Sequence, residues 1–142
     1  MRAAPVLLAA TLAAAAPAGC GAGGKEADGA GGKEADVRGV AGRFLAAAQR
    51  DDGAAACALL TSGTRRQLES DEGESCEKAI SSVELPAPSP VGRVAVYITS
   101  ASADLEVGGT LFLDETPSGW RVSAAGCAPR PGRQPFDCEL EA

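Results

Sequence analysis

The chain of 142 residues contains no histidine and no asparagine, and aromatic residues make up only 4% of it. The absence of histidine removes the commonest general base and the commonest metal ligand among side chains. The formal net charge of −6 argues against nucleic acid as a partner. The length is too short for a barrel enzyme or for a dinucleotide-binding enzyme with a substrate domain. One domain with one core remains.

The longest apolar stretch, residues 3–16, is shorter than the roughly 20 residues that a membrane-spanning helix needs. It follows Arg2 and ends in small residues, which is typical of a secretory signal peptide, here residues 1–19. The sequence Pro17-Ala18-Gly19-Cys20 resembles the lipobox of bacterial lipoproteins, although Pro17 stands where that family prefers an aliphatic residue. The resemblance implies that Cys20 is diacylated and anchors the protein to the outer face of the bacterial cytoplasmic membrane.

Ordinary signal cleavage after Ala18 is the alternative, and it would release a secreted protein. The five cysteines favour the lipid anchor, because an odd cysteine in an exported protein stays reactive or pairs between chains. Assigning Cys20 to lipid leaves an even number. Two acyl chains on one residue are sufficient for stable anchoring.

Residues 20–36 form the expected lipidated cysteine and a flexible tether. The unit Gly-Gly-Lys-Glu-Ala-Asp occurs at 23–28 and again at 31–36, eight residues later. Neither copy has a bulky apolar side chain, so the repeat cannot form a core. A single folded domain is expected over residues 37–142.

Helical spacing and capping residues predict several short helices in the first half of this domain. Asp36 is expected to cap a helix that begins at Val37. A second helix is expected over 54–60, a third opened by a capping box at 64–67, and a fourth capped by Ser75.

After the prolines of 86–90 the apolar residues alternate, which predicts strands near 93–99, 103–107, 110–114 and 120–124. Glycine turns separate the later strands and indicate an antiparallel meander. Helices followed by strands predict an α+β fold with the helices packed on one sheet face.

The segments FLAAAQRDDGAAACALLT (44–61) and GGTLFLDETPSGWRVSAAGCAPRPGRQPFDCELEA (108–142) resemble the small α+β cone of the nuclear transport factor two-like superfamily. More narrowly, they resemble actinobacterial lipoproteins of unassigned function. The resemblance implies a cone-like domain with a concave sheet face, and it does not select a function, because this fold hosts enzymes, binding proteins and scaffolds.

Four cysteines beyond Cys20 allow three pairings. We expect Cys57 to pair with Cys76 and Cys127 with Cys138, because both closed loops are short and the second loop is rich in proline. A zinc site is the alternative, but the cysteines lack paired C-x-x-C spacing. No metal or other cofactor is expected.

Two short motifs match catalytic patterns without their context. Ser75 and Lys78 fit S-x-x-K, but the partner motifs of that enzyme class are absent and acidic residues surround Lys78. Residues 19–25 fit the spacing of a phosphate loop but lack the Ser or Thr that follows its lysine. The acidic run 69–77 lacks the ligand spacing of a calcium loop and indicates a solvated turn. No catalytic residue is assigned.

Arg93, Tyr97, Phe112 and Trp120 are candidate lining residues of a ligand pocket on the concave sheet face. The competing interpretation, which we favour because large aromatic side chains are usually buried, places Phe112 and Trp120 in the core and leaves Arg93 exposed.

The sequence thus predicts a non-enzymatic, membrane-anchored lipoprotein that binds a small ligand or an envelope protein. A scaffold or dimerisation module without a ligand is one alternative. A small hydrolase or isomerase that uses pocket carboxylates is another.

Overall fold

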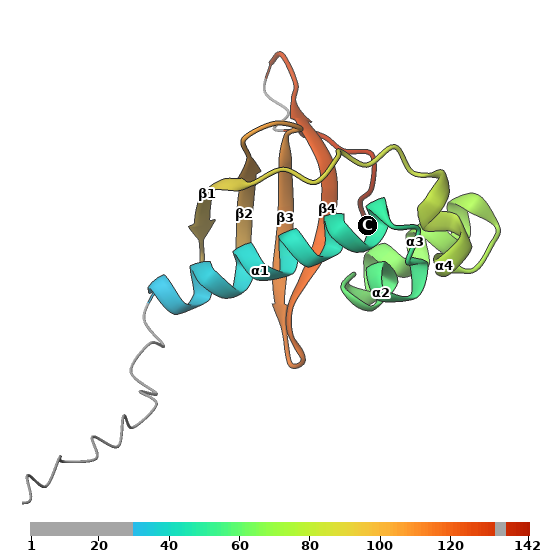
Figure 1. Ribbon diagram of the computed structural model, residues 1–142, viewed down its shortest axis with the longest axis horizontal. Coiled ribbons are helices and arrows are strands. Elements are labelled where there is room, and N and C mark those ends of the chain that lie inside the picture. Colours follow the sequence, from blue (N-terminus) through green and yellow to red (C-terminus); the bar gives the residue numbers. More distant parts are fainter. Residues whose placement is uncertain (1–29, 133–135) are drawn as a thin grey trace, which may run out of the picture.

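The computed structural model describes residues 30–132 and 136–142. A long helix is followed by three shorter helices, one 3₁₀ turn and five strands (Figure 1). The elements are α1 (Ala30–Gln49), α2 (Gly53–Ala58), α3 (Ser62–Glu72), α4 (Cys76–Ala79), η2 (Ile80–Ser82), β1 (Val91–Val96), β2 (Ser100–Leu105), β3 (Thr110–Thr116), β4 (Gly119–Pro129) and β5 (Phe136–Asp137).

The sheet is an antiparallel meander with the spatial order β1-β2-β3-β4-β5. Helix α1 crosses one face of it, and α2, α3 and α4 gather beyond β4 (Figure 1). The predicted α+β class, with helices packed on a meander and two disulfides, is confirmed.

The core lies between α1 and the sheet. Helix α1 buries one apolar stripe, and every second residue of β2 is buried against it. The buried residues of α1 are Val37, Val40, Ala41, Phe44, Leu45 and Ala47, and those that the strands contribute include Ala101, Ala103, Leu105, Leu111, Leu113, Trp120 and Val122.

Helix α1 does not begin at Val37 as expected, because Ala30 to Asp36 are already helical. The second copy of the repeat, 31–36, therefore belongs to α1, and that part of the expected tether is structured. In this part of α1, Lys33 forms an ion pair with Glu115 of β3 at 2.9 Å. The remainder of the tether, 20–29, lies outside the described residues.

The third helix begins two residues earlier than its predicted capping box. Thr61 is its N-cap and accepts a hydrogen bond from the backbone N–H of Thr64 at 3.1 Å. Thr64 is fully buried, and its hydroxyl donates to the backbone carbonyl of Ser123 in β4 at 2.9 Å. Ser75 occupies the N-cap position of α4, as expected, but its side chain makes no capping bond.

The edge of β4 that faces away from β3 is covered by three successive segments. The backbone N–H of Thr61 donates to the carbonyl of Val122 at 2.9 Å, and the N–H of Val122 donates to the carbonyl of Leu59 at 2.8 Å. Leu140 then bridges Ala125, and β5 pairs with the end of β4. The long strand therefore exposes little unpaired backbone.

Both disulfides have the expected connectivity. Cys57 in α2 is joined to Cys76 in α4, across 19 residues of sequence. Cys127 in β4 is joined to Cys138, across 11 residues. The first disulfide holds two short helices together, and the second holds the C-terminal tail against the sheet face opposite α1.

Substitution by alanine is expected to have opposite effects on stability at two glycines, Gly42 and Gly109. Gly42 lies on the exposed side of α1 with open space around it, so Gly42→Ala should stabilise the protein by up to about 1 kcal/mol. Gly109 has φ +92°, and a Cβ there would lie 2.5 Å from the carbonyl oxygen of Cys127. Gly109→Ala should destabilise by about 2 kcal/mol or more. Urea unfolding measures both, and a stabilising Gly109→Ala would contradict this turn geometry.

Removing Cys57 and Cys76 together, as a double alanine variant, should lower the free energy of unfolding by about 3 kcal/mol, because the closed loop restrains the unfolded chain. The Cys127→Ala/Cys138→Ala variant is the matched comparison, and a loss of similar order is expected for its shorter loop. Peptide mapping without reduction checks the connectivity directly. Crossed pairs or free thiols would contradict it.

Candidate functional site

The four residues predicted to line one pocket lie on different surfaces. Trp120 faces the core and is 5% exposed, whereas Phe112 faces the opposite side of the sheet. Arg93 lies on β1 with an exposed side chain, and Tyr97 lies in the turn after β1. The expected shared pocket is therefore not formed. Trp120 in the core and Arg93 exposed agree with the competing interpretation.

The sheet face opposite α1 is divided into a polar half and a covered half. On the polar half, Arg93 lies 3.9 Å from Asp104, which accepts a hydrogen bond from the Thr110 hydroxyl at 2.8 Å. On the covered half, Phe136 of the tail packs edge-to-face on Phe112 with ring centroids 4.9 Å apart. A hollow of about 280 Å³ remains on this covered half, and Phe112, Ala124, Phe136, Cys138 and Glu141 line it, without Arg93, Tyr97 or Trp120.

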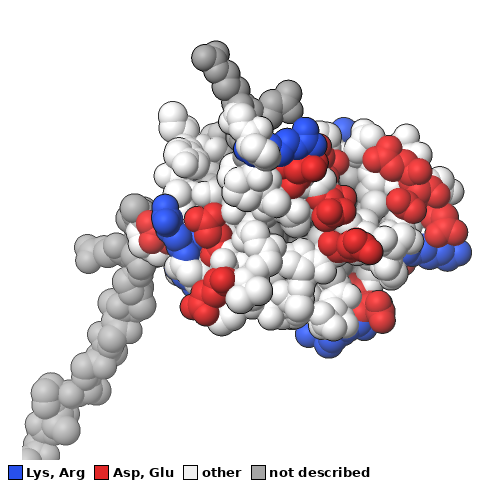
Figure 2. Space-filling model, turned by 90° about the horizontal axis from the view of Figure 1, so that it is seen from above, with Lys and Arg blue, Asp and Glu red and all other residues white. Residues whose placement is uncertain are grey.

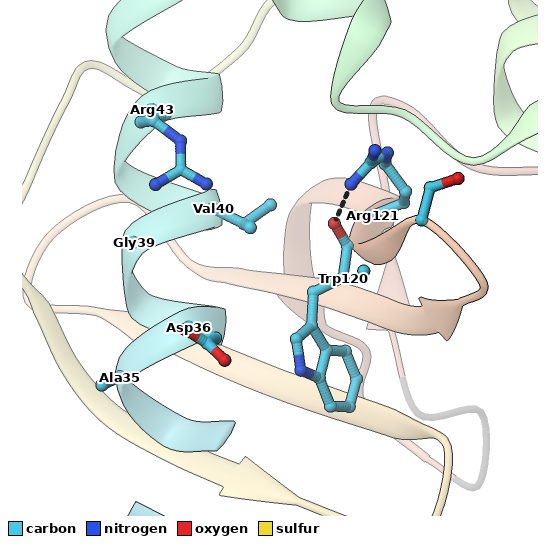
Figure 3. A pocket seen from close by; sticks show the side chains of 9 residues that line it. Ala35, Asp36, Gly39, Val40, Arg43, Trp120 and Arg121 are labelled. Carbon is cyan, nitrogen blue, oxygen red and sulfur yellow. Dashed lines mark hydrogen bonds between the residues drawn. The ribbon is translucent and has the colours of Figure 1, made fainter. Parts of the chain in front are cut away.

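A hollow of about 260 Å³ instead lies between α1 and the start of β4 (Figure 3). Its lining combines two arginines, one carboxylate and the only tryptophan of the chain. The lining residues are Ala35, Asp36, Gly39, Val40 and Arg43 of α1, and Ser118, Gly119, Trp120 and Arg121 of the β3–β4 hairpin.

Local geometry holds both guanidinium groups at the hollow. Arg43 follows Gly39 by one helical turn, and its Nη1 lies 3.2 Å from where a Cβ of Gly39 would be. Glycine at 39 thus leaves room for the arginine to lie along the helix. Arg121 donates from Nη1 to the backbone carbonyl of Trp120 at 2.8 Å, which draws its side chain back along β4 (Figure 3).

The charges of the hollow are not balanced within it. In the part of the chain that the structure describes, no carboxylate oxygen lies within ion-pair distance of Arg43 or Arg121. The nearby Lys33 is engaged by Glu115 and stands 6.0 Å from the centre of the Trp120 ring. Two guanidinium groups beside an aromatic edge provide donors suited to an anionic group.

A second, larger hollow of about 410 Å³ adjoins the first at Arg43 and lies between α1 and α2. Small apolar side chains dominate its lining, and Arg50 stands two helical turns from Arg43. The lining residues are Arg43, Ala46, Ala47, Arg50, Ala55, Ala58 and Leu59. The first hollow thus has charged side chains in its lining, and the second, beside it, has a mainly apolar lining.

The S-x-x-K match and the acidic run lie on the surface in the described part of the chain. Ser75 and Lys78 are exposed, and the intervening Cys76 is buried in its disulfide. Residues 69–77 lie at the end of the molecule with α3 and α4, where acidic side chains gather (Figure 2). Among the described residues, no group of three or more metal-binding side chains occurs. The phosphate-loop match at 19–25, like Cys20, lies outside the described residues.

The sequence pattern did not indicate Asp36, Gly39, Arg43 or Arg121 as site residues. The one local signal was the spacing of Gly39 and Arg43, one turn apart, on a helix with an apolar stripe. The contribution of Arg121 depends on how the hairpin packs against α1, which no local pattern encodes.

Comparison of the chain with protein-family models, with curated proteins and with solved structures finds no match. No helix among the described residues has the length and apolar character to cross a membrane.

Proposed function

We propose that this protein is a non-enzymatic binding module, anchored through a lipid on Cys20 to the outer face of a bacterial cytoplasmic membrane. It takes a small anionic ligand in the hollow between α1 and β4. The two disulfides support an oxidising compartment outside the cytoplasm. The signal-like leader and the odd cysteine support the anchor.

The observation that carries the binding proposal is that Arg43, Arg121 and Trp120 all line one hollow. The chain has a formal net charge of −6, yet these two guanidinium groups have no carboxylate partner among the described residues. A bound carboxylate, sulfonate or phosphate would supply that partner.

Each alternative finds less support in the geometry. A dimerising scaffold would favour an apolar, flat sheet face, but the face opposite α1 is polar at β1–β2 and covered by the tail at β3–β4. Hydrolysis or isomerisation by pocket carboxylates would favour a buried acid. Of the described polar side chains, only those of Thr64 and Thr110 are buried, and Asp36 in the hollow is exposed. An envelope protein remains an alternative ligand for the same groove.

The hollow can be tested with 8-anilinonaphthalene-1-sulfonate, a probe that combines an anionic group with aromatic rings. Trp120 is the only tryptophan and lines the hollow, so energy transfer from it detects the bound probe, and the arginine variants test where the probe binds. Arg43→Gln and Arg121→Gln should each weaken binding roughly tenfold, as expected for the loss of one charged hydrogen bond.

Arg66→Gln is the matched control, because Arg66 is an exposed arginine of α3 that does not line the hollow. It should leave the affinity unchanged. Equal weakening by all three variants would indicate nonspecific attraction to positive charge, and unchanged affinity in both hollow variants would contradict the proposed site.

The anchor makes a separate prediction. Cys20→Ala should release the protein from the membrane fraction, because the acyl chains supply the hydrophobic attachment. The intact mass of the native protein should fit a diacylated chain that begins at Cys20 and has lost four hydrogens to two disulfides. Membrane retention of Cys20→Ala, or a mass that begins at Gly19 without lipid, would contradict the anchor.

A further inference from the structure

The turn between β1 and β2 exposes two large apolar side chains next to each other. Tyr97 is 64% exposed and Ile98 is 89% exposed. The surrounding stretch 94–103 contains no charged residue. Together these features make the turn an uncharged, apolar projection on a protein with an acidic surface.

The residues of this turn are not those that tight turns usually contain. The N–H of Tyr97 donates to the carbonyl of Ser100 at 2.8 Å, which leaves Ile98 and Thr99 at the tip. Tight turns favour Gly, Asn, Asp, Pro and Ser, whereas both tip residues are β-branched. The next two turns follow the rule, with glycines at 108–109 and Pro-Ser-Gly at 117–119. The apolar tip thus calls for an explanation outside the turn itself.

The tip lies at the end of the molecule where the chain enters α1. The carbonyl of Thr99 accepts a hydrogen bond from the N–H of Glu115 at 2.8 Å, and the carboxylate of Glu115 pairs with Lys33 in the first turns of α1 at 2.9 Å. Figure 1 shows the first turns of α1 beside the lower end of β1. Val107, the third exposed large apolar residue in the described part of the chain, lies beyond the opposite end of β2.

The length of the chain before α1 brings this end close to the anchor. Nine residues lie between Cys20 and Ala30, and the ten Cα-to-Cα steps from one to the other span at most about 33–36 Å when fully extended. A lipid on Cys20 therefore confines the first turns of α1, and the turn beside them, to the neighbourhood of the bilayer.

We propose that the β1–β2 turn rests in the membrane interface, with Ile98 in contact with the acyl boundary and Tyr97 at the level of the headgroups. This placement rests on the proposed anchor at Cys20 and fixes the orientation of the domain on the membrane. Tyrosine suits the interface because it has an apolar ring and a polar tip.

A bilayer is a better occupant than a protein because of the size of the projection. Stable protein interfaces bury about 800 Å² on each partner and involve 20 or more residues. Two side chains on one turn cannot supply that area. They are sufficient to bias the orientation of a domain that a lipid already holds at the surface.

The experiment places a tryptophan at each end of β2 in the full mature chain, anchored in vesicles that contain brominated phospholipid. Ile98→Trp should lose fluorescence relative to vesicles without bromine. Val107→Trp, the matched control at the far end of the strand, should behave like the unsubstituted chain, whose Trp120 gives the background. Loss at both positions, or at neither, would overturn the proposal.

The failure of the anchor can be separated from the failure of the turn. Where intact mass shows no acylation, a maleimide phospholipid attached to Cys20 restores a tether of the same length, since the other four cysteines form disulfides. Quenching of Ile98→Trp in that preparation would still support membrane contact by the turn. A concentration-dependent dimer that Ile98→Ser abolishes, without quenching, would assign the turn to a second copy of the chain and overturn the proposal.

Discussion

The backbone hydrogen bonds between residues 59–61 and Val122 connect the helical half of the chain to the sheet. They use the free edge of β4, and the buried hydroxyl of Thr64 strengthens the same connection by donating to Ser123. A buried carbonyl without a donor costs about 1–3 kcal/mol, so this junction tolerates little displacement. The positions of α2, α3 and the disulfide at Cys57 all depend on it, because these elements follow one another with very short loops.

The same junction determines which surfaces of the protein stay open. Leu59 lines the larger hollow, and its carbonyl accepts the hydrogen bond from the N–H of Val122, so the wall of that hollow is part of the junction. Leu140 and β5 cover the rest of the β4 edge, and Phe136 of the tail packs on Phe112 on the sheet face opposite α1. The hollow between α1 and the hairpin stays open, and both Arg43 and Arg121 line it.

Local patterns were sufficient for the fold class, the order of elements and the cysteine pairing, because alternation, glycine turns and short loops are encoded by neighbouring residues. They failed where contacts between segments far apart in the sequence determine the structure. Thr64 fits a capping box, yet its hydroxyl bonds to a strand 59 residues away. Asp36 fits an N-cap, yet α1 already begins at Ala30, and Lys33 in this earlier part pairs with Glu115. Phe112 and Trp120 could not be placed from the sequence, because β3 and β4 shift register between Phe112 and Leu113.

The Lys33–Glu115 ion pair links the two proposals in space, since it lies between the β1–β2 turn and the Trp120 ring. Such an exposed pair contributes little stability by itself, about 0–1 kcal/mol, and is screened by salt. The pair joins the first turns of α1 to the β3–β4 hairpin, and Asp36, Gly39 and Trp120 of these two elements line the same hollow. The β1–β2 turn and the β3–β4 hairpin, which lines the hollow, lie at the same end of the meander, so both proposed contacts involve one end of the domain.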